Sequence, residues 1–310
     1  MRSGMRWTGI ASFLLPVILL PAGCSRSVPI APGSESVPGL EYGESREVSR
    51  LEDPRIDESS GIARSIRYRN AFWTHNDSGD TARIFLVGAD GRTRATVGLR
   101  GASAVDWEDI ASYGLGDESY VMVADVGDNA RRRSGLDLYV VRESGLDIPP
   151  GGDGAPGIEI EPDCHIRFSF EDGPHDCEAV AVDPTESAIY LVAKDAGEGG
   201  VYSMPLPPGG SGEPSIARRV ASIPVGYATA MDISPDGRRA VVLTYGDAFE
   251  FARGGGETWA RAFSREPRLI RTPKRPQGEA VCYGPDGRTL YLTSENAHQP
   301  LWEIPVVGNP

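Results

Sequence analysis

Three nearly matching stretches decide the fold: Glu178-Ala-Val-Ala-Val-Asp-Pro-Thr-Glu186, Thr229-Ala-Met-Asp-Ile-Ser-Pro-Asp-Gly237 and Glu279-Ala-Val-Cys-Tyr-Gly-Pro-Asp-Gly287. Their first residues are 51 and 50 positions apart. In each stretch an alternating pattern typical of a strand leads into a turn that contains proline. Two further strands are predicted after each turn, at 188–193 and 200–206, at 240–244 and 248–252, and at 289–293 and 301–306.

Two earlier stretches match this repeat more loosely, Ser60-Gly-Ile-Ala63 and Glu108-Asp-Ile-Ala111. The 70-residue interval between Glu108 and Glu178 contains Ile148–Gly157, which we interpret as an insertion in an outer hairpin. A period near fifty with several strands in each repeat is typical of β-propeller blades. We therefore predict an all-β protein, a single propeller of about five blades, with six as the alternative if the long interval hides another.

The last repeat contains three strands, so it needs a fourth from elsewhere in the chain. Arg46–Leu51, which precedes the first repeat, is the natural source. Pairing it with the last repeat would close the ring and cover an open sheet edge.

The amino-terminal segment has the pattern of an export signal. Two arginines precede the apolar run Gly9–Leu20, which is too short to span a membrane. Leu20-Pro21-Ala22-Gly23-Cys24 resembles the lipobox of bacterial lipoproteins, with Pro21 where leucine is usual. We expect a signal peptide at 1–23, a lipidated Cys24 with a flexible tether to residue 45, and the propeller at 46–310. This predicts an exported, membrane-anchored lipoprotein, in the outer membrane or periplasm if the cell is Gram-negative.

The charge of the chain limits its partners. A formal charge of −13 disfavours nucleic acid as a ligand and favours a cation or a cationic partner. After export a disulfide is possible, and Cys164 and Cys177 are the nearest pair, but buried single cysteines are the alternative.

Acidic residues gather at one end of the predicted inner strands. The start of the first strand and the end of the second lie on the same face of a propeller blade. On this face Glu108, Glu178 and Glu279 share one register, and repulsion between them would be relieved by a hard cation. Calcium prefers such oxygen ligands. The candidate ligands are Glu58, Glu108, Glu178, Glu279, Asn76, Asp77, Asp128 and Asn129.

Two histidines map to the same face and leave two functions open. His75 and His175 are candidate general bases beside these carboxylates. One hypothesis is an envelope-anchored binding or scaffold propeller that recognises a small ligand or an envelope protein. The alternative is a calcium-dependent hydrolase acting on a lactone or ester. No Gly-x-Ser-x-Gly, His-Glu-x-x-His or phosphate-loop motif is present.

Four motifs carry a resemblance to a known family: Glu58-Ser-Ser-Gly-Ile-Ala63, His75-Asn-Asp-Ser-Gly79, Asp106-Trp-Glu-Asp-Ile-Ala111 and Asp125-Val-Gly-Asp-Asn129. They resemble bacterial β-propeller lipoproteins similar to the SdiA-regulated family, a likeness that implies the fold over about residues 45–306. The ring of carboxylates also resembles calcium-dependent propellers of the gluconolactonase and paraoxonase type. That resemblance implies calcium ligands among Glu58, Glu108, Glu178 and Glu279, although those propellers have six blades.

Overall fold

Short, buried strands lie at the centre of the fold because each packs against neighbours on both sides. In strand β11 (Cys177–Asp183) all seven residues are buried. Such continuous burial is expected where both faces of a strand are covered. The computed structural model describes residues 39–148, 157–207 and 214–308.

The strands form five units, which we number I–V and describe from the inside outward. Unit I contains β2 (Ser59–Arg64), β3 (Ala71–Asn76), β4 (Arg83–Gly88) and β5 (Thr93–Leu99). Unit II contains β6 (Trp107–Leu115), β7 (Glu118–Asp125), β8 (Leu136–Arg142) and β10 (Cys164–Phe170). Unit III contains β11, β12 (Ala188–Ala193), β13 (Gly199–Pro205) and β14 (Ser215–Ile223). Unit IV contains β15 (Ala228–Ile233), β16 (Arg239–Thr244), β17 (Ala248–Ala252) and β18 (Arg268–Ile270). Unit V contains β19 (Ala280–Tyr283), β20 (Leu290–Thr293), β21 (Pro300–Ile304) and β1 (Arg46–Arg50).

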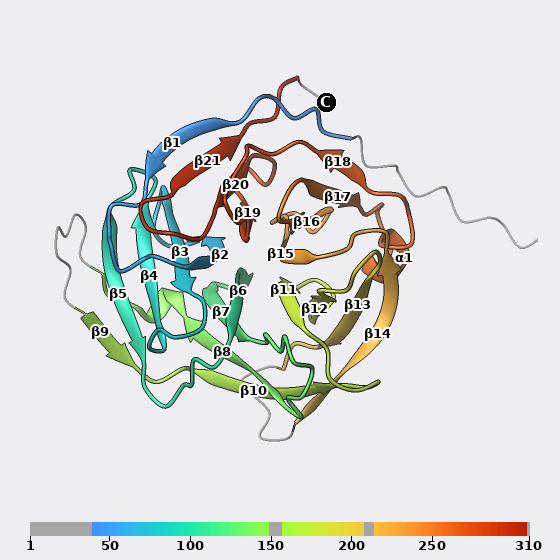
Figure 1. Cartoon of the computed structure of the whole chain (residues 1–310), viewed down its shortest axis with the longest axis horizontal. Coiled ribbons are helices and arrows are strands. Elements are labelled where there is room, and N and C mark those ends of the chain that lie inside the picture. Colours follow the sequence, from blue (N-terminus) through green and yellow to red (C-terminus); the bar gives the residue numbers. More distant parts are fainter. Residues whose placement is uncertain (1–38, 149–156, 208–213, 309–310) are drawn as a thin grey trace, which may run out of the picture. The chain divides into compact units, whose positions relative to one another are not determined.

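The inner strands of the five units form a ring, and we call the region that this ring encloses the channel, although buried side chains such as Asp109 occupy it. Strands β2, β6, β11, β15 and β19 contact one another in this order, and β19 in turn contacts β2. Figure 1 shows the sheets arranged around this ring. The strands within each unit pair antiparallel with their neighbours, as in β11, β12 and β13. The prediction of an all-β propeller is confirmed.

Strand β1 completes unit V, as the sequence indicated. It pairs antiparallel with β21, and Arg46 lies opposite Glu303 while Arg50 lies opposite Pro300. The ends of the folded region are therefore joined by backbone hydrogen bonds, which removes an exposed sheet edge.

The long interval between the second and third repeats is accounted for by an excursion from unit II. After β8, strand β9 (Gly157–Ile160) pairs parallel with β5 of unit I. The chain then returns as β10, which pairs with β8 and also with β14 of unit III. Residues 149–156 of the predicted insertion lie outside the described residues.

The folded region begins earlier than the predicted boundary between residues 45 and 46. Leu40 is 2% exposed, and Tyr42 forms a bridge with Val306. The Tyr42 hydroxyl also donates to Glu250 Oε1 at 2.5 Å. These side chains lie in a segment rich in Ser, Pro and Gly, but they extend the closure at unit V, so residues 40–43 are not part of a tether. The predicted signal peptide and Cys24 lie outside the described residues.

Apolar side chains between neighbouring units form the core. Trp73 and Trp107 belong to one buried cluster made by units I and II. The helical elements of the described residues are α1 (Trp259–Ala262) and the 3-10 turn η1 (Glu143–Gly145). Within the described ranges, no helix is long and apolar enough to cross a membrane. Cys164, Cys177 and Cys282 are free thiols, so the possible Cys164–Cys177 disulfide is not formed.

Candidate metal site

In four of the five inner strands the second residue takes no part in the regular pairing. In β6 the neighbours of Glu108 pair with Asp125 and Ala124, and Glu108 is skipped. The equivalent residues are Ser60 in β2, Glu178 in β11 and Thr229 in β15, with Glu279 directly before β19. A β-bulge re-aims its extra side chain. These five residues lie at the same end of the inner strands, which we call the acidic mouth.

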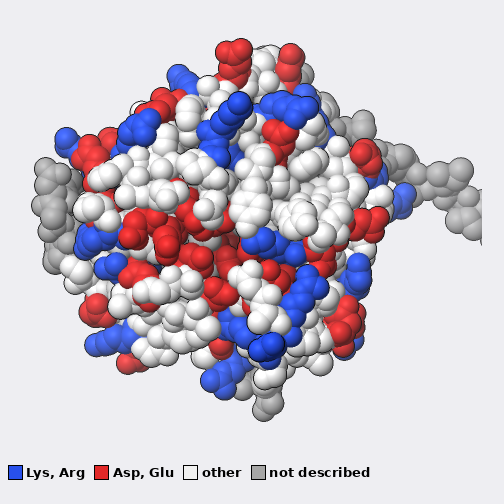
Figure 2. All heavy atoms as spheres, viewed as in Figure 1, with Lys and Arg blue, Asp and Glu red and all other residues white. Residues whose placement is uncertain are grey.

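Three carboxylates come together at the acidic mouth. Asp77 follows β3, whereas Asp106 and Glu108 lie at the start of β6, and one oxygen of each lies within 4.8 Å of the others. Gly127 packs against two of them: a Cβ atom there would lie 2.1 Å from Glu108 Oε1 and 2.5 Å from Asp106 Oδ2. Figure 2 shows acidic side chains gathered around the middle of this face.

Burial and mutual repulsion make ionisation of this cluster costly. Burial raises the pKa of Glu108 well above its usual value, and Glu178, Asp77 and Asp106 raise it further. Burial also raises the pKa of Asp77 to about 6 and that of Asp106 to a lesser extent, although Arg133 opposes the shift at Asp106. Two ion pairs lie nearby in the described part of the chain, Arg133–Asp125 and Lys194–Glu178. Neither includes any of the three carboxylates. A bound cation would remove much of this cost.

Glu178 already has a cation of its own. The Lys194 ammonium group donates a hydrogen bond to Glu178 Oε1 and lies 5.0 Å from the centre of the Tyr245 ring. Burial nevertheless raises the pKa of Glu178 to about 7, while Lys194 opposes that shift. Glu178 thus raises the pKa of Glu108, but its own charge is paired with Lys194, which belongs to the same unit.

Glu279 is hydrogen-bonded to a second carboxyl group, that of Glu295. Burial, together with the hydrogen bond with Glu279, raises the pKa of Glu295 to about 8. Gln277 Nε2 donates to the other side of Glu295 at 2.6 Å. This contact with Glu295 makes Glu279 less available as a metal ligand than Glu108.

The remaining predicted ligands have other contacts or are exposed. Asn76 accepts hydrogen bonds from the backbone N–H groups of Asp57 and Glu58, and its amide group donates to Asp80 at 2.9 Å. Asp128 Oδ2 accepts from the Arg133 backbone N–H at 2.7 Å. Glu58 and Asn129 are exposed. Asn76 therefore shapes the loop before β2, and its polar atoms are already in use.

Neither candidate histidine hydrogen-bonds to the carboxylate cluster. His75 is fully buried, its ring lies edge-on to Trp107, and its Nδ1 contacts the Asn76 carbonyl oxygen at 2.9 Å. Burial lowers its pKa to about 4, so the ring is neutral near pH 7. His175 Nε2 contacts Asp172 at 2.9 Å and the Tyr202 hydroxyl at 2.8 Å. One nitrogen of each ring has a local structural partner, whereas His75 Nε2 and His175 Nδ1 are buried without a hydrogen-bond partner among the described residues.

Other polar residues of the channel were not selected from the sequence. Asp106 lies two positions before Glu108 in the same motif, and this proximity is the feature of the sequence that could have identified it as a ligand. Lys194 follows β12, and only the pairing of β11 with β12 brings it to Glu178. Asp109 Oδ2 accepts hydrogen bonds from Val180 and Met231 of two other inner strands, at 2.8 and 3.0 Å. Asp109 thus joins units II, III and IV inside the channel.

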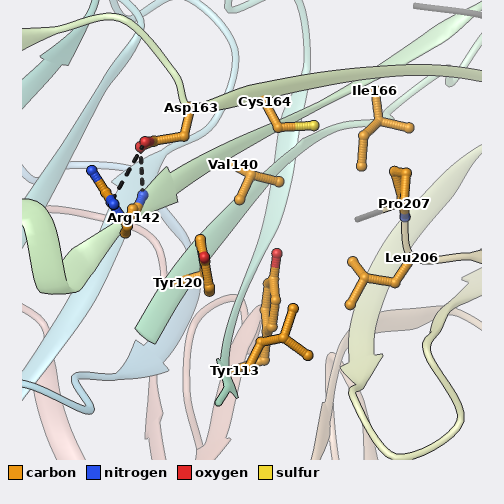
Figure 3. Close-up of a pocket in the computed structure, with 10 residues that line it drawn as sticks. Tyr113, Tyr120, Val140, Arg142, Asp163, Cys164, Ile166, Leu206 and Pro207 are labelled. Atoms are coloured by element: carbon orange, nitrogen blue, oxygen red, sulfur yellow. Dashed lines mark hydrogen bonds and ion pairs between the residues drawn. The ribbon is translucent and has the colours of Figure 1, made fainter. Parts of the chain in front are cut away.

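A separate cavity of about 270 Å³ lies between units II and III and contains none of the cluster carboxylates. Figure 3 shows its apolar side chains and the Arg142–Asp163 interaction at its edge. Two of the lining side chains, Tyr113 and Tyr120, are stacked with ring centres 5.3 Å apart. Burial raises the pKa of the Cys164 thiol in its wall. That thiol is therefore protonated near neutral pH and is a poor nucleophile.

Comparisons with known proteins concern the fold. No protein-family model matches the sequence, and no curated protein matches it significantly. A gluconolactonase from Xanthomonas campestris is similar in structure, with 13% identity and a TM-score of 0.47, over 90% of this chain and 99% of that one. A chain of the nidogen/laminin complex has 13% identity and a TM-score of 0.42, over 77% of this chain and 73% of that one. Hydrazine synthase from Kuenenia stuttgartiensis has 15% identity and a TM-score of 0.41, over 77% and 56%. All three TM-scores lie below 0.5, so these similarities carry no argument about this chain. The β-propeller fold rests on the strand pairing and on the contacts between the inner strands.

Proposed function

We propose that this protein is an envelope-anchored binding propeller that holds Ca²⁺ at Asp77, Asp106 and Glu108. The observation that carries the proposal is the convergence of three carboxylates from two units, with oxygens within 4.8 Å of one another. Two oxygens bound to one calcium ion at 2.3–2.6 Å are at most about 5 Å apart. The observed spacing meets that limit.

The surroundings of the cluster also fit a hard cation. The donors are all carboxylate oxygens, which calcium and magnesium prefer over the nitrogen and sulfur ligands that suit transition metals. The hydroxyl of Ser60, at the equivalent bulge of unit I, is buried and has no hydrogen-bond partner within the described residues. Gly127 leaves room for two of the carboxylates by having no side chain. Calcium tolerates irregular coordination better than magnesium does, and this set of groups is irregular.

The contacts of the histidines favour binding over hydrolysis. A calcium-dependent lactonase or esterase would need a group that moves a proton beside the ion. His75 and His175 have their hydrogen bonds elsewhere, to Asn76, Asp172 and Tyr202. We therefore assign to the acidic mouth the recognition of a small ligand or an envelope protein. Anchoring through Cys24 remains part of the proposal.

Calcium titration of the full chain tests the metal site. Calcium that binds only the native state stabilises it by about 2.7 kcal/mol at a hundredfold excess over Kd. We expect chelator to lower the melting temperature and calcium to restore it, and Glu108→Gln to abolish this response. Glu44→Gln, at an exposed position remote in sequence from the acidic mouth, is the matched control and should respond as the parent does.

Two results would reject the proposal. A parent protein with the same melting temperature in chelator and in calcium has no such site. Calcium-dependent hydrolysis of a lactone or ester, lost in Glu108→Gln and kept in Glu44→Gln, would replace the binding function with the enzymatic alternative.

A further inference from the structure

The channel has a second mouth, at the end where the inner strands finish. Here a cavity of about 220 Å³ is lined by residues of units I–IV. Its lining includes Arg64 at the end of β2, Asp183 at the end of β11 and Ile233 at the end of β15. The bulge residues of the acidic mouth lie at the opposite ends of the same strands. The cavity is thus separate from the proposed calcium site.

Arg64 brings to this cavity a cation that has no ion-pair partner among the described residues. Its guanidinium group forms no ion pair or hydrogen bond with the described residues, although its charge acts across the channel on Asp232. The carboxylate in the lining, Asp183, already has a cation: it forms an ion pair with Arg253 at 2.7 Å. Asp183 also accepts hydrogen bonds from Trp259 Nε1 and from the Thr185 hydroxyl. Its charge is therefore neutralised by groups other than Arg64.

The rest of the lining combines apolar walls with small polar groups. Ile66, Val182 and Ile233 line the cavity together with Ser112 and Thr185. A guanidinium group recognises a carboxylate through two parallel hydrogen bonds, and apolar walls favour an attached hydrocarbon group. The volume lies below the 300–1,000 Å³ that is usual for drug-sized ligands. A ligand of this cavity must therefore be small.

We propose that the second mouth binds a small organic carboxylate, with Arg64 holding the carboxylate group and the apolar walls contacting the hydrocarbon part. This site does not depend on the calcium site at the acidic mouth. It would make the channel a two-ended binding element, with a cation at one mouth and an organic anion at the other.

Benzoate and three related probes test the charge and the hydrocarbon requirement separately. Benzyl alcohol keeps the ring without the charge, acetate keeps the charge without the ring, and inorganic phosphate is an anion without hydrocarbon. Each is titrated into the full chain, and binding is followed by the backbone amide NMR signals. We expect benzoate to bind more tightly than the other three. Its shifts should be confined to the lining of the second mouth, including Ser112 and Thr185.

Variants of Arg64 test whether this residue recognises the charge of the ligand's carboxylate group. Arg64→Ala should weaken benzoate binding about tenfold or more, the loss expected for a hydrogen bond to a charged group. The affinity of Arg64→Lys for benzoate should lie between those of the parent and Arg64→Ala, because lysine keeps the charge but cannot form two parallel hydrogen bonds. Arg69→Ala removes the same charge from an exposed residue outside the cavity and should bind as the parent does.

Any of three outcomes would overturn the inference. Equal binding of benzoate and benzyl alcohol would show that charge is not recognised. Phosphate binding as tightly as benzoate would indicate a site for inorganic anions. Benzoate shifts outside the second mouth in the parent protein would place the ligand elsewhere, and this measurement decides the question even if Arg64→Ala fails to fold.

Discussion

Replacing Glu108 by glutamine should change how the stability of the metal-free protein depends on pH. Glu108 is 4% exposed, and burial and the neighbouring carboxylates raise its pKa well above its ordinary value. The folded protein therefore holds protons that the unfolded chain releases at the same pH. Under this condition the free energy of unfolding falls as pH rises, from the unfolded pKa near 4.5 up to the folded pKa. Glutamine has nearly the same shape and does not titrate, so it removes the contribution of this residue.

The size of the effect follows from the linkage relation. One carboxyl group with a raised pKa changes the free energy of unfolding by at most about 1.4 kcal/mol for each pH unit in this window. Between pH 5 and 7 the ceiling is therefore about 3 kcal/mol. For a domain of this size 1 kcal/mol corresponds to about 2–4 °C in melting temperature. The melting temperature of Glu108→Gln should thus exceed that of the parent by several degrees at pH 7 and by little at pH 5.

Thermal melts in chelator from pH 5 to 8 measure this difference. The parent should lose melting temperature as pH rises, because Asp77, Glu178 and Glu295 have folded pKa values of about 6, 7 and 8 and add to the effect. Glu108→Gln should show a shallower slope, and Glu44→Gln the parental slope. If Glu108→Gln and the parent have parallel curves, Glu108 is not part of a repelling cluster and the electrostatic reasoning is wrong.

Three further predictions concern single positions. Gly127→Ala places a Cβ atom 2.1 Å from Glu108 Oε1 and should remove the effect of calcium on the melting temperature. The control Gly157→Ala has open space around its Cβ atom and should leave that effect unchanged. An unaltered calcium effect in Gly127→Ala would contradict the proposed ligand arrangement. Lys194→Met leaves the buried Glu178 without its cation and should lower the free energy of unfolding at pH 8 by about 3 kcal/mol, measured by denaturant titration. Adding Glu178→Gln to this variant should restore part of the lost stability. Failure of the second change to restore stability would mean that Lys194 acts through packing alone. If Cys24 is lipidated as proposed, Cys24→Ser should move the protein from the membrane to the soluble fraction, because the acyl chains would provide the anchor. Equal partitioning of the two proteins in detergent phase separation would exclude lipidation at Cys24.

The architecture could be predicted from the sequence because strand patterns are local. In the repeats that begin at Glu178 and Thr229, alternating apolar residues and a proline turn fix which residues pair. The observed β12 and β17 have the predicted bounds, Ala188–Ala193 and Ala248–Ala252. The equivalence of Glu108, Glu178 and Glu279 followed from the same repeat. The role of β1 could be predicted too, since a propeller with an incomplete last unit needs a strand from the other end of the chain.

The composition of the acidic cluster depended on contacts between segments that the repeat does not relate. Asp77 and Glu108 come from different units, and their approach is set by how the units pack around the channel. Glu178 shares the register of Glu108, yet Lys194 supplies its cation, and Glu279 contacts Glu295. A repeat predicts which backbone positions are equivalent, but the partners of a charged side chain depend on residues that differ from unit to unit.

The sequence by itself determined the inner strands, their order around the ring and the end of the channel at which the acids gather, whereas β9, β10, β14 and β18 were not predicted. Only the tertiary structure decided that Asp77, Asp106 and Glu108 form the cluster, that His75 is buried, and that Arg64 faces a cavity at the opposite mouth. Backbone pairing follows short-range patterns of apolar residues and turns. The distances between side chains of different units follow from closure of the ring, which involves the whole folded chain.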